Sequence, residues 1–126
     1  MHTTETDGRA TIAEMAQAAH AAGIEYIAMT DHSRNLAMAN GLDEVRALAH
    51  AARIRAEDGR HGVRLLAGIE CDILADGSMD LSDDCLAQLD FVVASVHSAF
   101  GQDRQQMTDR ILRAIENPHV DVIGHP

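Results

Sequence analysis

Side chains able to bind a metal ion follow four apolar segments that have the length of buried strands. Helical patterns separate these segments, so the strands are expected to run parallel, with their carboxyl ends at one edge of a sheet. Active sites of parallel α/β folds lie at that edge. The groups in question are Asp31 and His32 after residues 26–30, Glu70 after 63–69, His97 after 91–96 and His125 after 120–124.

His2 and Asp7 lie just before the first helical pattern, where a preceding strand would end, and they join the same edge. Imidazole and carboxylate groups are ligands of zinc, manganese and iron. A single histidine at a strand end is more often a hydrogen-bonded structural residue, but four successive strand ends with such groups are hard to obtain by chance. The pattern predicts a metal site built from His2, Asp7, His32, Glu70, His97 and His125.

The other four histidines are expected to be structural. His20 and His50 lie within helical patterns, His61 lies in a glycine-flanked turn, and His119 precedes a strand rather than following it. Other chemistries find no support, because the sequence contains no GxxxxGK[ST] phosphate loop, no GxGxxG fingerprint and no G-x-S-x-G nucleophile elbow.

The composition is that of one globular domain with an aliphatic core. Of its 126 residues 46% are hydrophobic, and only one tyrosine and two phenylalanines are present. The formal net charge of −10 argues against unaided nucleic-acid binding and fits carboxylates gathered around cations, although simple acidic solubility explains it equally well. Cys71 and Cys85 are interpreted as reduced, buried thiols. Neither a signal peptide nor a membrane span is recognised, so a cytoplasmic location is expected.

Helices and strands alternate in the predicted secondary structure. Thr11 and Glu14 form a capping-box pair, and Gly23 stops the helix that they begin. Asp43 is expected to cap the second helix, and the last helix is expected to begin at Asp103 or Arg104. The predicted elements are helices at 12–22, 44–58, 82–89 and 103–116 or 104–116, strands at 26–30, 63–69 or 63–73, 91–96 and 120–123, and a loop at 33–41.

The burial of these elements is predicted from their apolar residues. The strands are almost continuously apolar, which is typical of a parallel sheet covered on both faces. Helical periodicity gives each helix one inward face. The residues predicted to face inward are Val45, Leu48, Ala49 and Ala52 in the second helix, and Met107, Ile111, Ala114 and Ile115 in the last.

Five short motifs resemble, in order and spacing, those of the PHP (polymerase and histidinol phosphatase) superfamily. Segments 37–42, 95–100 and 115–119 are similar to the C-terminal PHP domain of bacterial family X DNA polymerases in particular. The resemblance implies an α/β fold, a distorted (βα)7 TIM-like barrel, of which this chain forms roughly the first half. The motifs are His2-Thr3-Thr4 with Thr6-Asp7-Gly8, Thr30-Asp31-His32, Gly68-Ile69-Glu70, Ser95-Val96-His97 and Gly124-His125-Pro126.

The resemblance also implies a centre of up to three divalent ions, which would be manganese, zinc or iron. A metal-bound water would be the catalytic group, held by Glu70, His97 and His125. The implied assignments are His2 and Glu70 for one metal, Glu70, His97 and His125 for a second that Glu70 bridges to the first, and Asp7 and His32 for a third.

Two further residues are candidates for supporting roles. Asp31 would orient a metal ligand or, equally well, stabilise the turn in which it lies. Arg34, in the loop after His32, would contact a substrate phosphate or simply lie in solvent.

The sequence departs from the family pattern at both ends. The first histidine of the opening H-x-H motif and a late Asp-x-His motif do not occur. Residues 1–126 are therefore expected to be one partial PHP domain, truncated at both ends.

The function implied by the resemblance is metal-dependent phosphoester hydrolysis, in the form of 3′-to-5′ trimming of DNA ends beside a polymerase domain upstream in the parent chain. One alternative is a small-molecule phosphatase of the histidinol phosphate type. Another is a non-catalytic scaffold module attached to a polymerase. No membrane partner is expected.

Overall fold

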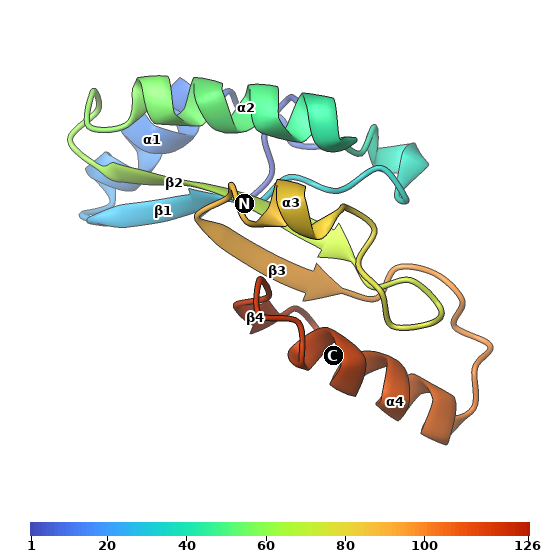
Figure 1. Cartoon of the computed structure of the whole chain (residues 1–126). Helices are drawn as coiled ribbons and strands as arrows, with labels where there is room; N and C mark the ends of the chain where they lie inside the picture. The colour runs from blue at the N-terminus through green and yellow to red at the C-terminus, as the bar shows by residue number, and fades with distance from the viewer.

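The computed structural model describes residues 1–126, and helices alternate with strands along it as the sequence predicts (Figure 1). The predicted loop at 33–41 contains a short 3₁₀ helix. The elements are α1 (Ile12–Ala21), β1 (Tyr26–Met29), η1 (Ala37–Ala39), α2 (Glu44–Glu57), β2 (Arg64–Asp72), α3 (Asp83–Leu86), β3 (Phe91–Ser95), α4 (Arg104–Ile115) and β4 (Val122–Ile123).

Side-chain caps set the first residues of the helices. Thr11 and Glu14 form the predicted capping box at α1, and Asp43 accepts a hydrogen bond from a backbone N–H of the first turn of α2. Asp103 and Gln106 form a second capping box at α4. Each cap satisfies backbone donors that the first helical turn leaves without partners.

The four strands form one parallel sheet in the order β1-β2-β3-β4, so each strand pairs with its neighbours along the chain. Met29 lies beside Ala67, and Cys71 lies beside Ala94. An isolated bridge between His32 and Glu70 continues the β1–β2 pairing past the end of β1. The α/β class with parallel strands is confirmed, and the arrangement agrees with a section of a (βα) barrel.

The helices cover only one face of this sheet, so the prediction of coverage on both faces is wrong. Figure 1 shows α1 and α2 together on one side of β1 and β2, with α4 beside β3 and β4. Side chains alternate between the faces of a strand, and every second strand residue contacts helices. These core residues are Ile27, Met29, Leu65, Ala67, Ile69, Cys71, Val92 and Ala94.

Residues between them, such as Leu66 and Val93, are only half-buried and lie on the other face. The same face carries Glu70 and Asp72 near the carboxyl end of β2. An apolar strand composition therefore does not require a second layer of helices here.

Two predicted inward faces are also wrong in part. Val45 is 78% exposed, and α2 instead buries Ala47, His50, Ala51 and Ile54. In α4, Ala114 is buried as predicted, whereas Ile115 is 54% exposed and Arg110 is buried in its place. The physical reason is that His50 and Arg110 bind buried acceptors, so polar residues occupy positions that hydrophobicity alone assigns to solvent.

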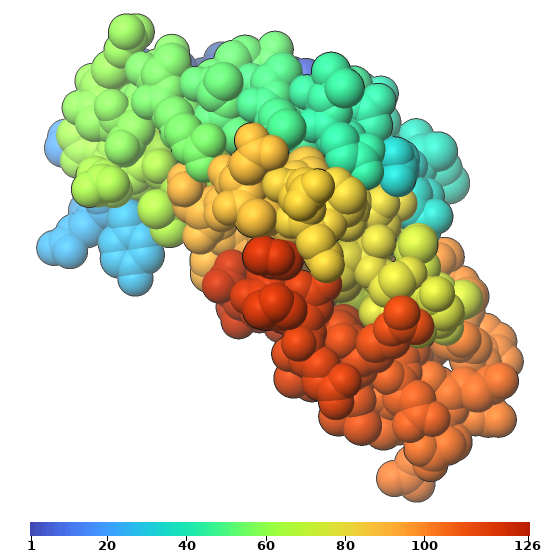
Figure 2. Space-filling model, viewed as in Figure 1, coloured from blue at the N-terminus to red at the C-terminus, as the bar shows by residue number.

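Figure 2 shows one continuous body, with the residues of α4 extending from one end of it. Cys71 and Cys85 are free and buried, as predicted. Burial raises the pKa of the Cys71 thiol to about 12, so this group stays protonated and unreactive near neutral pH. No helix combines the length and the hydrophobicity that crossing a lipid bilayer requires.

Candidate metal centre

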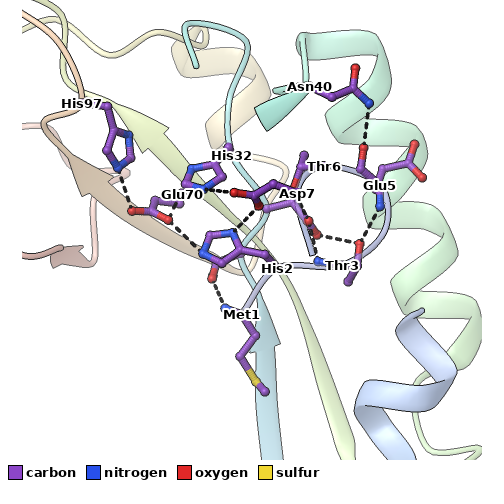
Figure 3. Close-up of polar contacts among 12 residues, drawn as sticks. Met1, His2, Thr3, Glu5, Thr6, Asp7, His32, Asn40, Glu70 and His97 are labelled. Atoms are coloured by element: carbon purple, nitrogen blue, oxygen red, sulfur yellow. Dashed lines mark hydrogen bonds and ion pairs between the residues drawn. The ribbon is translucent and has the colours of Figure 1, made fainter. Parts of the chain in front are cut away.

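The carboxyl edge of the sheet gathers residues from five parts of the chain. Figure 3 shows the carboxylate of Glu70 between the rings of His2 and His32 on one side and the ring of His97 on the other. Glu70 lies inside β2, two residues before its end, which agrees with the longer of the two predicted extents of this strand. The other groups come from the segment before α1 (His2, Asp7), from the ends of β1 (His32) and β3 (His97), and from the segment after β4 (His125).

Glu70 offers one oxygen to each of two histidine pairs. Its Oε2 lies 3.3 Å from His2 Nε2 and 3.5 Å from His32 Nδ1. Its Oε1 lies 3.3 Å from His97 Nε2 and 3.1 Å from His125 Nε2. Two clusters of metal-binding atoms result, each with its atoms within 4.8 Å of one another, and Glu70 belongs to both. A carboxylate in that position can bridge two cations.

Asp7 lies at the outer side of the first cluster. Its Oδ2 is 3.4 Å from His32 Nε2, and its Oδ1 is 3.9 Å from His2 Nδ1. His32 therefore faces a carboxylate with each ring nitrogen, Asp7 on one side and Glu70 on the other. In the assignment implied by the family, His32 served only the metal of Asp7; the geometry also groups it with His2 and Glu70.

The chemistry of this donor set fits divalent cations. Nδ1 of His2 and Nδ1 of His32 are buried and have no hydrogen-bond partner, which is costly for polar atoms unless something binds them. The four rings are also crowded: the centroids of His2 and His32 are 4.3 Å apart, and those of His97 and His125 are 5.1 Å apart. Neutral imidazoles with free lone pairs suit such a cluster, and these are the form that binds manganese, zinc or iron.

Burial and neighbouring groups at this edge of the sheet keep His2 and Glu70 in the protonation states that bind metal ions. Burial lowers the pKa of His2, and the neighbouring His32 and N-terminal amine lower it further, against the opposing effect of Glu70 and Asp7. Burial by itself raises the pKa of Glu70, but the nearby Ser95 hydroxyl and the neighbouring rings of His32, His97 and His2 outweigh it, so this pKa is lowered. The edge thus combines a neutral imidazole with an ionised carboxylate near neutral pH.

Comparison with known proteins decides the family. Residues 1–124 match the PHP domain family. This chain belongs to the PHP family. The DNA polymerase/3′-5′ exonuclease PolX of Bacillus subtilis is 45% identical over the whole chain, which confirms the predicted resemblance. Probable phosphatases of Acetivibrio thermocellus and Thermoanaerobacter sp. are 35% and 36% identical over 92% of the chain. The chain spans 22% of the polymerase and 47% of each phosphatase.

Asp31 of this PHP domain holds the segment that carries His2 and Asp7. Its carboxylate is fully buried and accepts hydrogen bonds from the backbone N–H of Thr3 (2.7 Å) and from the hydroxyls of Thr3 and Thr6. Thr3 and Thr6 lie 25 or more residues before Asp31 in the sequence, so these contacts join the N-terminal segment to the residues that follow β1.

His50 makes the fourth hydrogen bond to the Asp31 carboxylate, with its Nε2 2.8 Å from Oδ2. Burial alone raises the pKa of Asp31, but the hydrogen bonds from His50, Thr6 and Thr3 outweigh it and bring this pKa to about 2. His50 is expected to be structural, and it belongs to neither cluster of metal-binding atoms. Its contact with Asp31 was not predicted, since a histidine within a helical pattern gives no sign of its partner.

Asp72 is the supporting residue that sequence reasoning missed. It is fully buried, and its Oδ1 lies 2.6 Å from Nδ1 of His97. A signal did exist, because Asp72 follows Glu70 by two residues on one strand, and such residues face the same side.

Arg34 points to acidic groups outside the six candidate ligands. Its Nη1 donates to Glu44 at 2.8 Å, and its Nε lies 3.5 Å from Asp80. The side chain is 50% exposed, so its positive charge is already partly compensated in this PHP domain.

Proposed function

We propose that this PHP domain is a metal-dependent phosphoester hydrolase. The observation that carries the proposal is the position of Glu70, whose two oxygens face two separate histidine pairs. This arrangement suits two cations close together, with His2, His32, His97 and His125 completing their coordination. Asp7 is the candidate ligand of a third cation, together with His32.

Divalent cations held there would supply an activated water and neutralise the charge of the phosphoryl oxygens. The residues of the chain would bind and position these cations. Glu70 supplies a negative charge that attracts cations to the edge, and the histidines supply neutral lone pairs. Without cations, an anionic phosphoester would face the carboxylates of Glu70 and Asp7 with no free arginine beside them, because Arg34 is engaged by Glu44.

The substrate that we propose is a phosphodiester at the 3′ end of DNA. The support is the 45% identity to a protein named a DNA polymerase/3′-5′ exonuclease. The net charge of −10 argues that a basic partner, such as a polymerase domain in the same parent chain, would hold the DNA. The second candidate is phosphomonoester hydrolysis, favoured by the relatives named probable phosphatases.

Hydrolysis of two chromogenic esters tests the proposal. With Mn²⁺, we expect turnover of bis(p-nitrophenyl) phosphate, and a decrease of about 100-fold or more in Glu70→Gln and His97→Ala, since even supporting residues contribute 10–100-fold. His20→Ala is the matched control, because His20 is exposed and remote from the site. Preference for p-nitrophenyl phosphate would favour the phosphatase. Bound metal without hydrolysis of either ester would contradict the proposal and favour a non-catalytic module.

A labelled oligonucleotide tests the finer assignment. A 5′-labelled single strand should be shortened stepwise from its 3′ end in Mn²⁺, and the Glu70→Gln variant should leave it intact. Release of only a terminal phosphate from a 3′-phosphorylated strand would instead identify a phosphomonoesterase.

A further inference from the structure

A buried carboxylate beside His97 bears on which ring nitrogen of this histidine carries the proton. Asp72 is fully buried, and each of its two oxygens has one partner. Oδ1 lies 2.6 Å from His97 Nδ1, and Oδ2 accepts from Asn35 Nδ2 at 2.7 Å. The backbone N–H of Asp72 donates to Ser33 Oγ at 3.0 Å, which fixes the strand at this point.

The amide of Asn35 is itself held in one orientation. Its Nδ2 donates to Asp72 and also lies 3.3 Å from Ser98 Oγ, so both of its N–H groups have acceptors. Its backbone N–H donates to Asp80 Oδ2 at 2.8 Å. Because a carboxylate offers only acceptors, the remaining oxygen of Asp72 requires a donor at His97 Nδ1.

The other nitrogen of His97 has two possible uses. His97 Nε2 lies 3.3 Å from Glu70 Oε1 and 3.3 Å from His125 Nε2. With a proton on Nε2, the ring would donate to Glu70 and block coordination. With the proton on Nδ1, the lone pair of Nε2 points into the cluster. The tautomer with the proton on Nδ1 can therefore bind a cation through Nε2, whereas the tautomer with the proton on Nε2 cannot.

We propose that Asp72 is a positioning residue that, with Asn35 behind it, keeps the proton of His97 on Nδ1 and so presents Nε2 to the cation shared with Glu70 and His125. This inference rests on the proposed metal-dependent function, which it deepens. Carboxylate partners of this kind fix the tautomer of metal-binding histidines in other proteins.

The substitution Asp72→Asn tests this role without changing the packing, because the asparagine side chain has nearly the same shape as that of aspartate. The new amide has one oxygen, whereas Asn35 and His97 Nδ1 both present donors to position 72. Asn35 stays fixed by Ser98 and Asp80, so the oxygen serves Asn35 and the NH₂ group faces His97. Nδ1 of His97 then becomes an acceptor, and the proton moves to Nε2.

The experiment combines two readouts on the chain. ¹⁵N NMR of the histidine rings in metal-free protein at neutral pH should show His97 protonated on Nδ1 in the wild type and on Nε2 in Asp72→Asn. Calorimetric titration with Zn²⁺ should show affinity at one site reduced about 10–100-fold in this variant. Asp90→Asn is the matched control, since the Asp90 carboxylate binds Arg55 and the backbone N–H of Ala67 on the same strand and takes no part in the Asp72–Asn35 pair.

A rescue variant tests the role of Asn35. In Asn35→Ala with Asp72→Asn, the oxygen of the new amide is free to face His97, so the Nδ1 proton and much of the zinc affinity should return. A double variant that behaves like Asp72→Asn would overturn the proposal, since the loss would then be structural damage. So would a wild type protonated on Nε2, or an Asp72→Asn variant with wild-type tautomer and affinity. The NMR readout needs neither metal nor hydrolysis, so an inactive protein would contradict only the proposed function.

Discussion

At the residue scale, the organisation of the site depends on carboxylates that each serve more than one partner. Glu70 faces four histidines, Asp72 joins His97 to Asn35, and Asp31 joins the N-terminal segment to His50. A carboxylate has several acceptor positions and can hold segments distant in sequence. These three residues therefore link the strands to the loops that carry the candidate ligands.

The carboxylate of Asp31 should make stability depend on pH. Its pKa in the folded protein is about 2, below the ordinary aspartate value of 3.8, so its contribution to stability is present above about pH 4 and is lost as the pH falls toward 2. The lowered pKa of Asp31 corresponds to a contribution of about 2 kcal/mol to the free energy of unfolding. Urea unfolding in EDTA at several pH values measures this effect. Between pH 5 and pH 2, the free energy of unfolding of the wild type should fall by about 2 kcal/mol more than that of Asp31→Asn. Parallel pH profiles for the two proteins would contradict the assignment.

The candidate ligands were accessible from sequence because each one lies at or near a strand end. Asp72 was overlooked although it follows Glu70 by two residues on one strand, and His50 lies in a helical pattern that gives no sign of its partner. Their partners, His97 and Asp31, become neighbours only through strand pairing and helix packing. The pairing of buried polar groups is thus a property of tertiary structure that local patterns do not contain.

At the element scale, glycines let segments approach closely enough to bring the ligands together. A Cβ at Gly124 would lie 2.3 Å from Ser95 Oγ, and a Cβ at Gly8 would lie 2.2 Å from the backbone oxygen of His2. Gly124 thereby sets the distance of β4 from β3, next to His125. Gly8 sets the turn that carries His2.

Alanine at these glycines should damage the two clusters selectively. Gly124→Ala should weaken zinc binding at Glu70, His97 and His125, and Gly8→Ala should weaken it at His2, His32 and Glu70, each with a loss of about 1–3 kcal/mol in stability from overpacking. Gly101→Ala is the control, because its Cβ would meet nothing within 4 Å. Calorimetry and urea unfolding measure both effects. Equal zinc binding in the three variants would show that these close approaches do not position the ligands.

The helices and strands themselves followed from caps and apolar runs, as Thr11 and Asp43 illustrate. Their buried faces followed less well. Arg110, which hydrophobicity assigns to solvent, is buried because its guanidinium donates to the backbone oxygens of Ile73 and Ser98. Periodicity locates an element, but contacts with the rest of the fold decide which of its polar residues are buried.

At the scale of the whole molecule, the edge ligands belong to four strands and the N-terminal segment, so cation binding should stabilise the entire sheet. A ligand at 100 times its dissociation constant adds about 2.7 kcal/mol. For a chain of this length we expect Mn²⁺ or Zn²⁺ to raise Tm by on the order of 10 °C, reversibly on adding EDTA. Ca²⁺, which prefers oxygen ligands, is the control and should change Tm little. A Tm insensitive to all three ions would contradict a shared site.

The overall class and family were predictable because ordered motifs at successive strand ends constrain a parallel fold strongly. The one-sided covering of the sheet was not, since apolar strands look alike whether their second face meets helices or the inside of a barrel. The chain also spans only part of its relatives, 22% of the polymerase, so the activity of a longer protein stays a proposal.

The central claim is that Glu70 bridges two cations at the carboxyl edge of the sheet. Anomalous diffraction at the manganese edge, from crystals of this chain grown with Mn²⁺, tests it most directly. We predict two peaks, one beside His2 and His32 and one beside His97 and His125, roughly 3.5–4 Å apart across the carboxylate, and neither peak in Glu70→Gln. Peaks elsewhere on the molecule, or two peaks that persist unchanged in that variant, would contradict the claim.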